Sequence, residues 1–224
     1  VPICAFTVAR GSNSSARGAY VRLSDFKGAS SQAPRALEAI RDHQCGWFYW
    51  ARSSNFEKIP GAPIAYWLSA DLLRTFEESP PISAHASVCL GMRTGDNDRF
   101  LRRWWEVSFE SMGRSIRTRE DALNRGARWI PYNKGGQGRR WYGNQEFVVN
   151  WADDGFEIKD NTLRVYPQLS WDNLGWKISN EQHFFKPLVS WSKISSGAAA
   201  FRYFPEGFIF DVAGTSIVAS SEDE

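Results

Sequence analysis

ARWIPYNKGGQGRRWYGNQEFVVNW (Ala127–Trp151) contains the strongest strand signal in a chain of 224 residues. Its two ends, Ala127–Tyr132 and Glu146–Trp151, are rich in aromatic and β-branched residues, which predicts a β-strand at each end. The glycine-rich segment between them, Gly135–Gly138, predicts a flexible loop. A phosphate-binding loop is the less favoured interpretation, because no helix signal follows the glycines.

The β-rich composition continues on both sides of this run, and helical periodicity fades after Val88. Further strands are predicted at Leu188–Ile194, Ala199–Phe204, Phe208–Phe210 and Ser216–Ala219, with turns at Asp153–Gly155 and Pro205–Gly207. Arg99–Val107 is ambiguous, since its tryptophan pair and valine favour a strand while its arginine and leucine content favours a helix. Residues 86–219 are therefore expected to form one β-rich domain.

The first 85 residues have a mixed pattern. Val1–Ala9 is apolar and predicts a buried strand. Two helices are predicted, at Pro34–Asp42 and at Asp71–Glu78, the second with Ser69 as its N-cap. We therefore expect an α+β chain: a small mixed segment over residues 1–85, a β-rich domain over 86–219 and an acidic tail over 220–224.

The composition is that of a folded protein, with 42% hydrophobic and 23% charged residues, and it excludes wholesale disorder. The sequence contains no apolar run of the roughly 18 residues that a membrane-spanning helix needs, so we expect a cytoplasmic protein without membrane contact. Three cysteines and three histidines are scattered along the chain. Their distribution predicts neither a disulfide framework nor a metal site.

The sequence motifs of the common enzyme classes are absent: there is no GxGxxG, Walker A, HExxH, GxSxG or CxxC. Asp153 and Asp154 precede a glycine and predict a turn rather than a pair of catalytic acids. Ser79–Ile82 (SPPI) is similar to the motif with which amino-methylating enzymes hold an amine, but Ile82 stands where the stacking ring is needed. We therefore expect no catalytic residue and a recognition module rather than a self-sufficient enzyme.

Positive charge is concentrated between Arg93 and Arg140. This stretch holds twelve basic and six acidic residues, a net charge of +6 in a chain whose total is +2. Eleven of the twelve are arginine, whose forked guanidinium binds phosphate and guanine edges through two hydrogen bonds. The pattern indicates a nucleic-acid surface. The alternative is a solvated face on which the arginines pair with carboxylates.

Several stretches together resemble a known family. The segments that carry the resemblance are Val1–Phe6 (VPICAF), Ile59–Trp67 (IPGAPIAYW), Gly91–Leu101 (GMRTGDNDRFL), Trp129–Gly143 (WIPYNKGGQGRRWYG), Val148–Trp151 (VVNW) and Phe201–Gly214 (FRYFPEGFIFDVAG). In this order they resemble the PglX-type adenine-specific DNA methyltransferases of BREX phage-resistance systems, over nearly the whole chain.

The resemblance implies methylation of adenine in DNA with S-adenosylmethionine as the methyl donor. The family's cofactor-binding glycine motif and its Asn-Pro-Pro-Tyr catalytic motif have no match in this sequence. We therefore expect a fragment: the tail of the catalytic domain and a linker over residues 1–85, then part of the target-recognition domain over 86–219. The cofactor would belong to the full-length parent, and the implied partners are double-stranded DNA and other phage-defence proteins.

The candidate DNA-binding residues divide by the contact each side chain suits. Phosphate contacts are expected from Arg102, Arg103, Arg114, Arg117, Arg119 and Arg125, and base contacts from Asn133, Lys134, Gln137, Arg139 and Arg140. Arg93 and Arg99 are further DNA-binding candidates, and Trp141 and Tyr142 are candidates for stacking on a displaced base. The loop 133–140 is expected to be exposed and mobile. Core packing is the favoured interpretation of Trp104, Trp105, Trp141 and Tyr142, and a tight structural turn is the favoured interpretation of Thr94–Asn97.

Two other function classes remain open. A protein-interaction module of a phage-defence complex would use the aromatic surface to hold its partners. An independent enzyme such as a nuclease would need clustered carboxylates to bind metal, which the sequence does not show convincingly.

Overall fold

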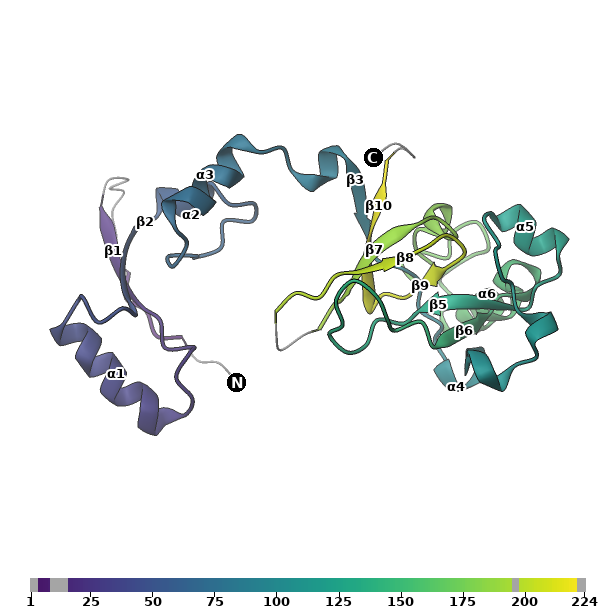
Figure 1. Cartoon of the computed structure of the whole chain (residues 1–224), viewed down its shortest axis with the longest axis horizontal. Helices are drawn as coiled ribbons and strands as arrows, with labels where there is room; N and C mark the ends of the chain where they lie inside the picture. The colour runs from purple at the N-terminus through teal and green to yellow at the C-terminus, as the bar shows by residue number, and fades with distance from the viewer. Residues whose placement is uncertain (1–3, 9–15, 195–197, 221–224) are drawn as a thin grey trace. The chain divides into compact units, whose positions relative to one another are not determined.

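A computed structural model describes residues 4–8, 16–194 and 198–220 (Figure 1). The chain divides into two compact units, Val1–Pro81 and Ile82–Glu224, which we describe separately. Helices and strands occur in both units, which confirms the α+β prediction. Most of the predicted acidic tail, residues 221–224, lies outside the described residues. None of the helices in the described part of the chain is long and apolar enough to cross a bilayer.

The first unit is a two-stranded antiparallel sheet with three helices. Its elements are β1 (Arg17–Val21), α1 (Ala29–Arg41), β2 (Phe48–Arg52), α2 (Ser54–Glu57) and α3 (Ala70–Glu78). Tyr20 on β1 stacks on Tyr66 with ring centres 4.7 Å apart and meets Phe56 edge-on. The Ser69 hydroxyl accepts a hydrogen bond from the amide of Leu72 at 3.3 Å, so the predicted N-cap of α3 is confirmed.

The predicted buried strand at the start of the chain is wrong for the residues that the structure describes. Cys4–Val8 has no regular secondary structure, and Phe6 and Val8 are 79% and 86% exposed. A strand needs a hydrogen-bonded neighbour, and the sheet of this unit pairs only β1 with β2 among the described residues. Apolar composition alone was therefore not sufficient to predict a strand. Val1–Ile3 and Ala9 lie outside the described residues.

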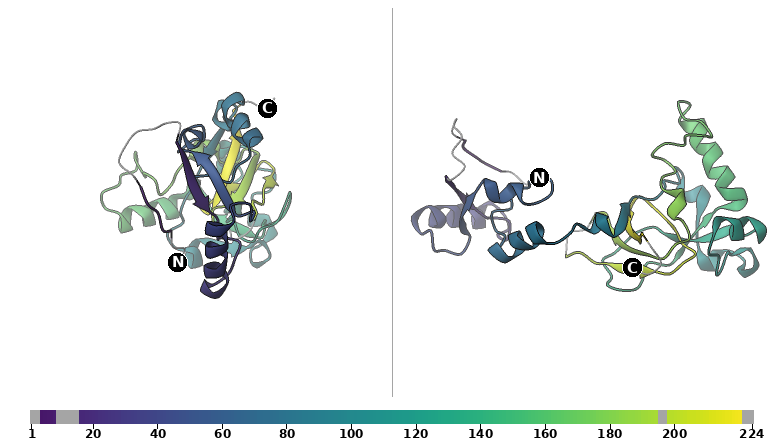
Figure 2. Two further views of the ribbon diagram at one scale, coloured as in Figure 1. Left: turned by 90° about the vertical axis from the view of Figure 1, so that its left-hand side faces the viewer. Right: turned by 90° about the horizontal axis from the view of Figure 1, so that it is seen from above.

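The second unit contains two four-stranded sheets (Figures 1 and 2). In the first sheet the antiparallel order is β3 (Ala86–Cys89), β10 (Gly214–Ala219), β7 (Leu188–Ser192) and β8 (Arg202–Phe204). In the second the order is β4 (Leu101–Arg103), β6 (Phe147–Asn150), β5 (Trp129–Asn133) and β9 (Ile209–Phe210), with β9 parallel to β5. The predicted strands of this region are confirmed, with ends shifted by a few residues.

Helices of the second unit lie between the strands. They are α4 (Asn97–Phe100), α5 (Arg119–Asn124) and α6 (Ala152–Val165), with short 3₁₀ turns at Ile82–Ala84, Trp104–Glu106, Phe109–Ser111 and Glu181–His183. The ambiguous Arg99–Val107 segment thus contains a helix end, a strand and a 3₁₀ turn. α4 ends in that segment because its C-cap, Leu101, is already extended (φ −111°, ψ 148°).

α6 is a correction to the expectation that helical periodicity fades after Val88. Asp153, Asp154 and Gly155 form the predicted turn, since all three have left-handed backbone angles. The regular helix then continues to Val165, with Ile158 and Thr162 buried at a spacing of four. The helix was not predicted because its apolar face is short and the segment consists mainly of turn residues and polar side chains.

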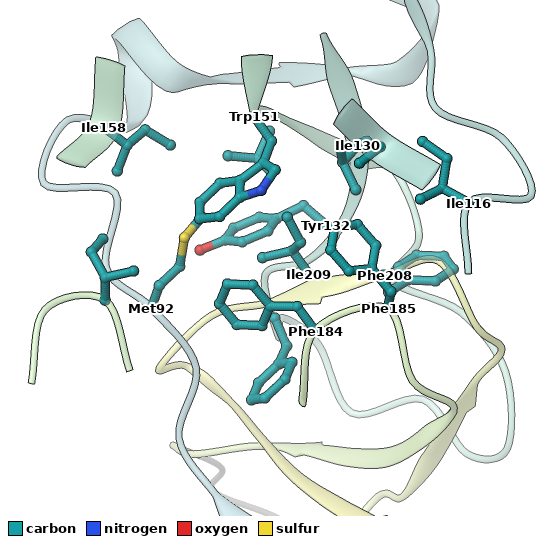
Figure 3. Close-up of a cluster of buried hydrophobic side chains, with 14 of the residues drawn as sticks. Met92, Ile116, Ile130, Tyr132, Trp151, Ile158, Phe184, Phe185, Phe208 and Ile209 are labelled. Atoms are coloured by element: carbon teal, nitrogen blue, oxygen red, sulfur yellow. The ribbon is translucent and has the colours of Figure 1, made fainter. Parts of the chain in front are cut away.

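One hydrophobic core serves both sheets of the second unit. It takes Leu188, Phe204 and Val218 from the first sheet, and Ile130 and Val149 from the second. Figure 3 shows the aromatic centre, where the nearly fully buried Trp151 lies among Met92, Tyr132 and Phe184. Trp151 and Phe184 meet edge-on with ring centres 5.5 Å apart. The sheets therefore cannot pack independently of each other.

The crossing point of the two sheets requires a residue without a side chain. A Cβ on Gly91 would lie 1.8 Å from the carbonyl oxygen of Phe210. This approach lets the Met92 amide donate to Phe210 and the Val212 amide donate to Met92, each at 3.0 Å. Gly91 follows β3 and Phe210 ends β9, so the contact joins one sheet to the other.

We expect Gly91→Ala to lower the free energy of unfolding by about 3 kcal/mol or more, because the added methyl group must displace main-chain atoms. Gly138→Ala is the matched control, since its Cβ would meet the nearest atom at an ordinary 3.7 Å. Chemical denaturation followed by tryptophan fluorescence measures both. Equal stability of the two variants would contradict this account of the crossing point.

Candidate nucleic-acid interface

Three of the segments that carry the family resemblance meet at one edge of the second sheet. Because β5 and β9 are parallel neighbours, their carboxyl ends lie at the same edge. Lys134 follows β5 and Asp211 follows β9, and the Asp211 amide donates to the carbonyl of Asn133 at 2.9 Å. The third segment, Gly91–Leu101, contributes the turn at Thr94–Asn97, which lies beside Lys134.

The Asp211 carboxylate is the centre of this group and is 2% exposed. It accepts hydrogen bonds from the Tyr132 hydroxyl at 2.7 Å, the Lys134 ammonium at 2.6 Å and the Ala213 amide at 2.7 Å. Burial and the neighbouring Asp211 charge raise the pKa of Tyr132 well above its ordinary value. The hydroxyl therefore stays protonated and continues to donate. Three donors compensate the cost of burying the charge.

The Thr94–Asn97 motif is the tight structural turn that the sequence favoured. The Thr94 hydroxyl donates to the Asn97 side-chain oxygen at 2.6 Å, and the Lys134 ammonium lies 3.3 Å from the same oxygen. Asp96 caps α4 by accepting from the Arg99 amide at 3.0 Å. These contacts orient Lys134 toward Asp211.

Asn133 is not an exposed loop residue, contrary to the sequence-based expectation. Its side chain is completely buried. The amide nitrogen donates to the Ser190 hydroxyl at 2.8 Å, and the amide oxygen accepts from the Gly135 amide at 3.1 Å. Asn133 thus links β5 to β7 of the other sheet and cannot reach a base from this position.

An open pocket of about 470 Å³ lies beside Lys134. It is lined by Asn97, Asp98, Leu101, Arg102, Arg103, Glu106, Lys134 and Phe147. Three of the predicted cations therefore share one surface hollow. The Arg103 guanidinium lies 4.1 Å from the centre of the Phe147 ring, while Arg102 donates to the carbonyls of Asp98 and Leu101 at 2.6 Å.

Half of the twelve basic residues between Arg93 and Arg140 pair with carboxylates. The pairs are Arg99–Glu157, Arg117–Glu206, Arg119–Asp154, Arg128–Glu157, Lys134–Asp211 and Arg139–Glu146. Four others lie over aromatic rings: Arg93 lies 4.4 Å from the centre of Trp176, Arg102 5.8 Å from that of Trp129, Arg103 4.1 Å from that of Phe147 and Arg114 3.3 Å from that of Phe109. The net charge that DNA would meet is therefore smaller than the sequence count suggests, and a single positive face stays a prediction.

The preference for core packing of four aromatic residues is wrong, because all four are exposed. Trp104 and Trp105 are 50% and 58% exposed, and Trp141 and Tyr142 are 74% and 72% exposed. Gln137, Arg139 and Arg140 are exposed beside the last two. We call the five residues Gln137, Arg139, Arg140, Trp141 and Tyr142 the reader loop.

The reader loop is fixed at its backbone although its side chains face solvent. The Trp141 amide donates to the carbonyl of Phe201 at 2.8 Å, and the Tyr203 amide donates to the carbonyl of Trp141 at 3.0 Å. The Arg202 guanidinium, completely buried, donates to the carbonyls of Gln137 and Arg139 at 3.3 and 3.5 Å. The sequence analysis missed Arg202, and its one signal was an arginine inside the apolar run AAFRYF.

Trp141 has a backbone conformation that bulky residues rarely adopt. Its φ is 71°, in the left-handed region that favours glycine. Such strain persists only where surrounding contacts impose it, and it is common at functional sites. Here the contacts are the two hydrogen bonds to the β8 region.

Two curated proteins are similar to this chain. "Adenine-specific methyltransferase PglX" of Lacticaseibacillus casei (strain Zhang) is 37% identical over 204 residues, and "Adenine-specific methyltransferase BrxX" of Escherichia coli O9:H4 (strain HS) is 34% identical over 172 residues. These alignments cover 91% and 76% of the chain. The chain matches a segment of the PglX/BrxX-type adenine-specific methyltransferases. The resemblance predicted from the sequence is thereby confirmed.

The PglX/BrxX-type proteins are much longer than this chain, which spans 16% of the first relative and 12% of the second. Neither unit of the chain contains 204 residues, so the similarity to the PglX relative extends into both. No protein-family model matches the chain.

We expect Lys134→Met to cost about 3 kcal/mol of stability, because it leaves the buried Asp211 carboxylate without its ion-pair partner. The double variant Lys134→Met/Asp211→Asn should recover most of that loss, since the amide oxygen can accept from the Ala213 amide while the amide nitrogen donates to the Tyr132 hydroxyl. Urea denaturation of the wild-type chain, the two single variants Lys134→Met and Asp211→Asn, and the double variant measures the coupling. Additive losses in the double variant would show that the pair does not act as a unit.

Backbone strain at Trp141 predicts a difference between two truncations. Trp141→Gly should be about 1 kcal/mol more stable than Trp141→Ala, because glycine adopts a φ of 71° without the Cβ clash. Both variants lose the same exposed ring, so each serves as the control for the other. Equal melting temperatures would mean that the left-handed conformation carries no strain.

Proposed function

We propose that the chain is a DNA target-recognition segment of a cytoplasmic, adenine-specific DNA methyltransferase of a phage-defence or restriction-modification system. Residues 86–219 would read the target, and residues 1–85 would be the tail of the catalytic domain and a linker. One observation supports this most directly: the reader loop presents polar, basic and aromatic side chains on a fixed backbone. The similarity to PglX/BrxX-type proteins supplies the chemical context.

Each member of the reader loop suits a particular contact with DNA. The Gln137 amide pairs with adenine through two hydrogen bonds, and the Arg139 guanidinium pairs in the same way with guanine. The flat faces of Trp141 and Tyr142 suit stacking on an unpaired base. Arg140 has no ion-pair partner among the described residues and is available to a phosphate oxygen.

Affinity would come mainly from phosphate contacts and the release of counterions. Arg102 and Arg103 in the open pocket are the best placed of the predicted phosphate contacts, because no carboxylate pairs with either within the described ranges. Arg99, Arg117 and Arg119 would first have to leave Glu157, Glu206 and Asp154. We rank these three lower for that reason.

Methyl transfer itself would belong to the parent enzyme, with S-adenosylmethionine as its donor. The cofactor-binding and catalytic motifs of the family have no counterpart in these 224 residues. This chain would therefore recognise the DNA target sequence, and another part of the parent enzyme would transfer the methyl group.

Measurements of DNA binding by variants of the chain distinguish phosphate contacts from base contacts. We expect Arg102→Ala/Arg103→Ala to weaken binding to all duplexes and to reduce the salt dependence, because both phosphate contacts are lost. Gln137→Ala or Arg139→Ala should cost roughly 1–3 kcal/mol on the preferred duplex and little elsewhere. Fluorescence anisotropy with duplexes selected from a randomised pool measures all of these.

Arg164→Ala is the matched control, since it removes one exposed positive charge that pairs with Asp160 on α6. It should leave site preference unchanged. A wild-type chain without salt-dependent DNA binding would overturn the proposal.

A protein-interaction module of a phage-defence complex is the second candidate. Phe156 on α6 stacks on Trp171 with ring centres 5.4 Å apart, and each remains about half exposed. Such an aromatic surface is typical of protein contacts. This candidate predicts binding that does not depend steeply on salt.

A further inference from the structure

We infer that Arg202 is a positioning residue for target reading, and that it holds the reader loop in its DNA-binding conformation before DNA arrives. The inference rests on the proposed function and adds to it the residue that sets the geometry of the reader. Arg202 lies on β8, about sixty positions after the loop in the sequence.

The contacts of Arg202 converge on the loop. One terminal nitrogen, Nη1, donates to the carbonyls of Gln137, Arg139 and Ala200 at 3.3, 3.5 and 3.3 Å. The other, Nη2, donates to the Ser192 hydroxyl at 3.1 Å. Ser192 in turn donates to the carbonyl of Gly136 at 2.5 Å. The fork of one guanidinium thus reaches the loop both directly and through Ser192.

This arrangement costs stability, which argues for a role beyond packing. Arg202 is completely buried, and no carboxylate pairs with it among the described residues. Its Nε has no hydrogen-bond partner there either. Burial and the nearby Arg139 charge lower the pKa of Arg202, although a guanidinium stays protonated at neutral pH. An apolar residue of similar size would avoid these costs but would leave the carbonyls of Arg139 and Ala200 without the Arg202 donor.

The neighbouring backbone supports the same conclusion. Asn144 donates from its side chain to the carbonyl of Gln137 at 2.9 Å, so that oxygen receives two donors. Trp141 is held at a left-handed φ by its hydrogen bonds to Phe201 and Tyr203. The loop is therefore restrained at Gly136, Gln137, Arg139 and Trp141 while all five reader side chains remain outside.

Restraint of this kind favours binding because the ordering entropy has already been lost in the free protein. A mobile loop would lose that entropy when it forms its base contacts with the preferred sequence, whereas phosphate contacts elsewhere on the surface would not require it to become ordered. A fixed loop also places Gln137 and Arg139 at a constant separation, which is what discrimination between base sequences requires. Loosening the loop should therefore reduce specificity more than general affinity.

Two variants test the inference at different cost to folding. Arg202→Lys keeps the charge and the reach but cannot hold several acceptors in a planar fork. Ser192→Ala removes two hydrogen bonds from a half-buried position and is the gentler change. Tyr203→Phe is the matched control on the same strand, because its ring is 54% exposed and faces away from the loop contacts. Thermal unfolding establishes that each protein is folded.

The first measurement needs no DNA. Hydrogen exchange of the Trp141 amide, which donates to the Phe201 carbonyl, should be slow in the wild-type chain and in Tyr203→Phe. Arg202→Lys and Ser192→Ala should accelerate it about tenfold, as expected when a local opening becomes easier. Fast exchange in the wild-type chain would overturn the inference, whatever the chain does with DNA.

The second measurement uses duplexes selected by the wild-type chain from a pool with a randomised core. In Arg202→Lys and Ser192→Ala, the ratio of affinities for the selected and unselected duplexes should fall about tenfold, with the salt dependence unchanged. An equal loss on all duplexes would indicate a merely structural role and overturn the inference. A protected loop in a wild-type chain that binds no duplex would instead overturn the proposed function.

Discussion

The buried ion pair between Asp211 and Lys134 is the interaction on which the second unit depends. A carboxylate that is 2% exposed must be neutralised or fully hydrogen-bonded. The parallel pairing of β5 with β9 brings Lys134 and Tyr132 to it. A separate parallel bridge between Met92 and Asp211 brings Gly91 against Phe210, where the two sheets share one core. A change in the register of β5 and β9 would break the ion pair and the core together.

The residues that follow Lys134 in the chain lead from this ion pair to the candidate interface. The glycines after Lys134 lead into the reader loop, whose backbone is bound by residues of the first sheet. The second sheet thus supplies the start of the loop, and the first sheet supplies Ser192 and Arg202 to fix its course. Exposed side chains on a restrained backbone combine accessibility with geometric precision, which recognition of a base sequence requires.

The surface has less unpaired positive charge than the number of arginines in the sequence implies. α6 carries Asp154 and Glu157, which pair with three of the arginines from the basic stretch. The Asp154 carboxylate also forms an ion pair with the buried Lys159 ammonium at 2.7 Å. These pairs stabilise the packing of α6 and remove charge from the surface. Of the basic residues in this stretch that have no carboxylate partner among the described residues, Arg102 and Arg103 lie on β4 and Arg140 lies in the reader loop.

The sequence by itself determined the family resemblance, the strands β5 to β10 of the second unit, the N-cap at Ser69 and the turn at Thr94–Asn97. Each of these depends on local composition or on residues a few positions apart, where backbone preference and short-range hydrogen bonds dominate. Only the tertiary structure decided that Asn133 is buried, that Trp141 and Tyr142 are exposed and that Arg202 holds the loop. Burial and partnership at these positions depend on strands that pair across fifty residues or more, and no local pattern encodes which face of such a pair meets the core.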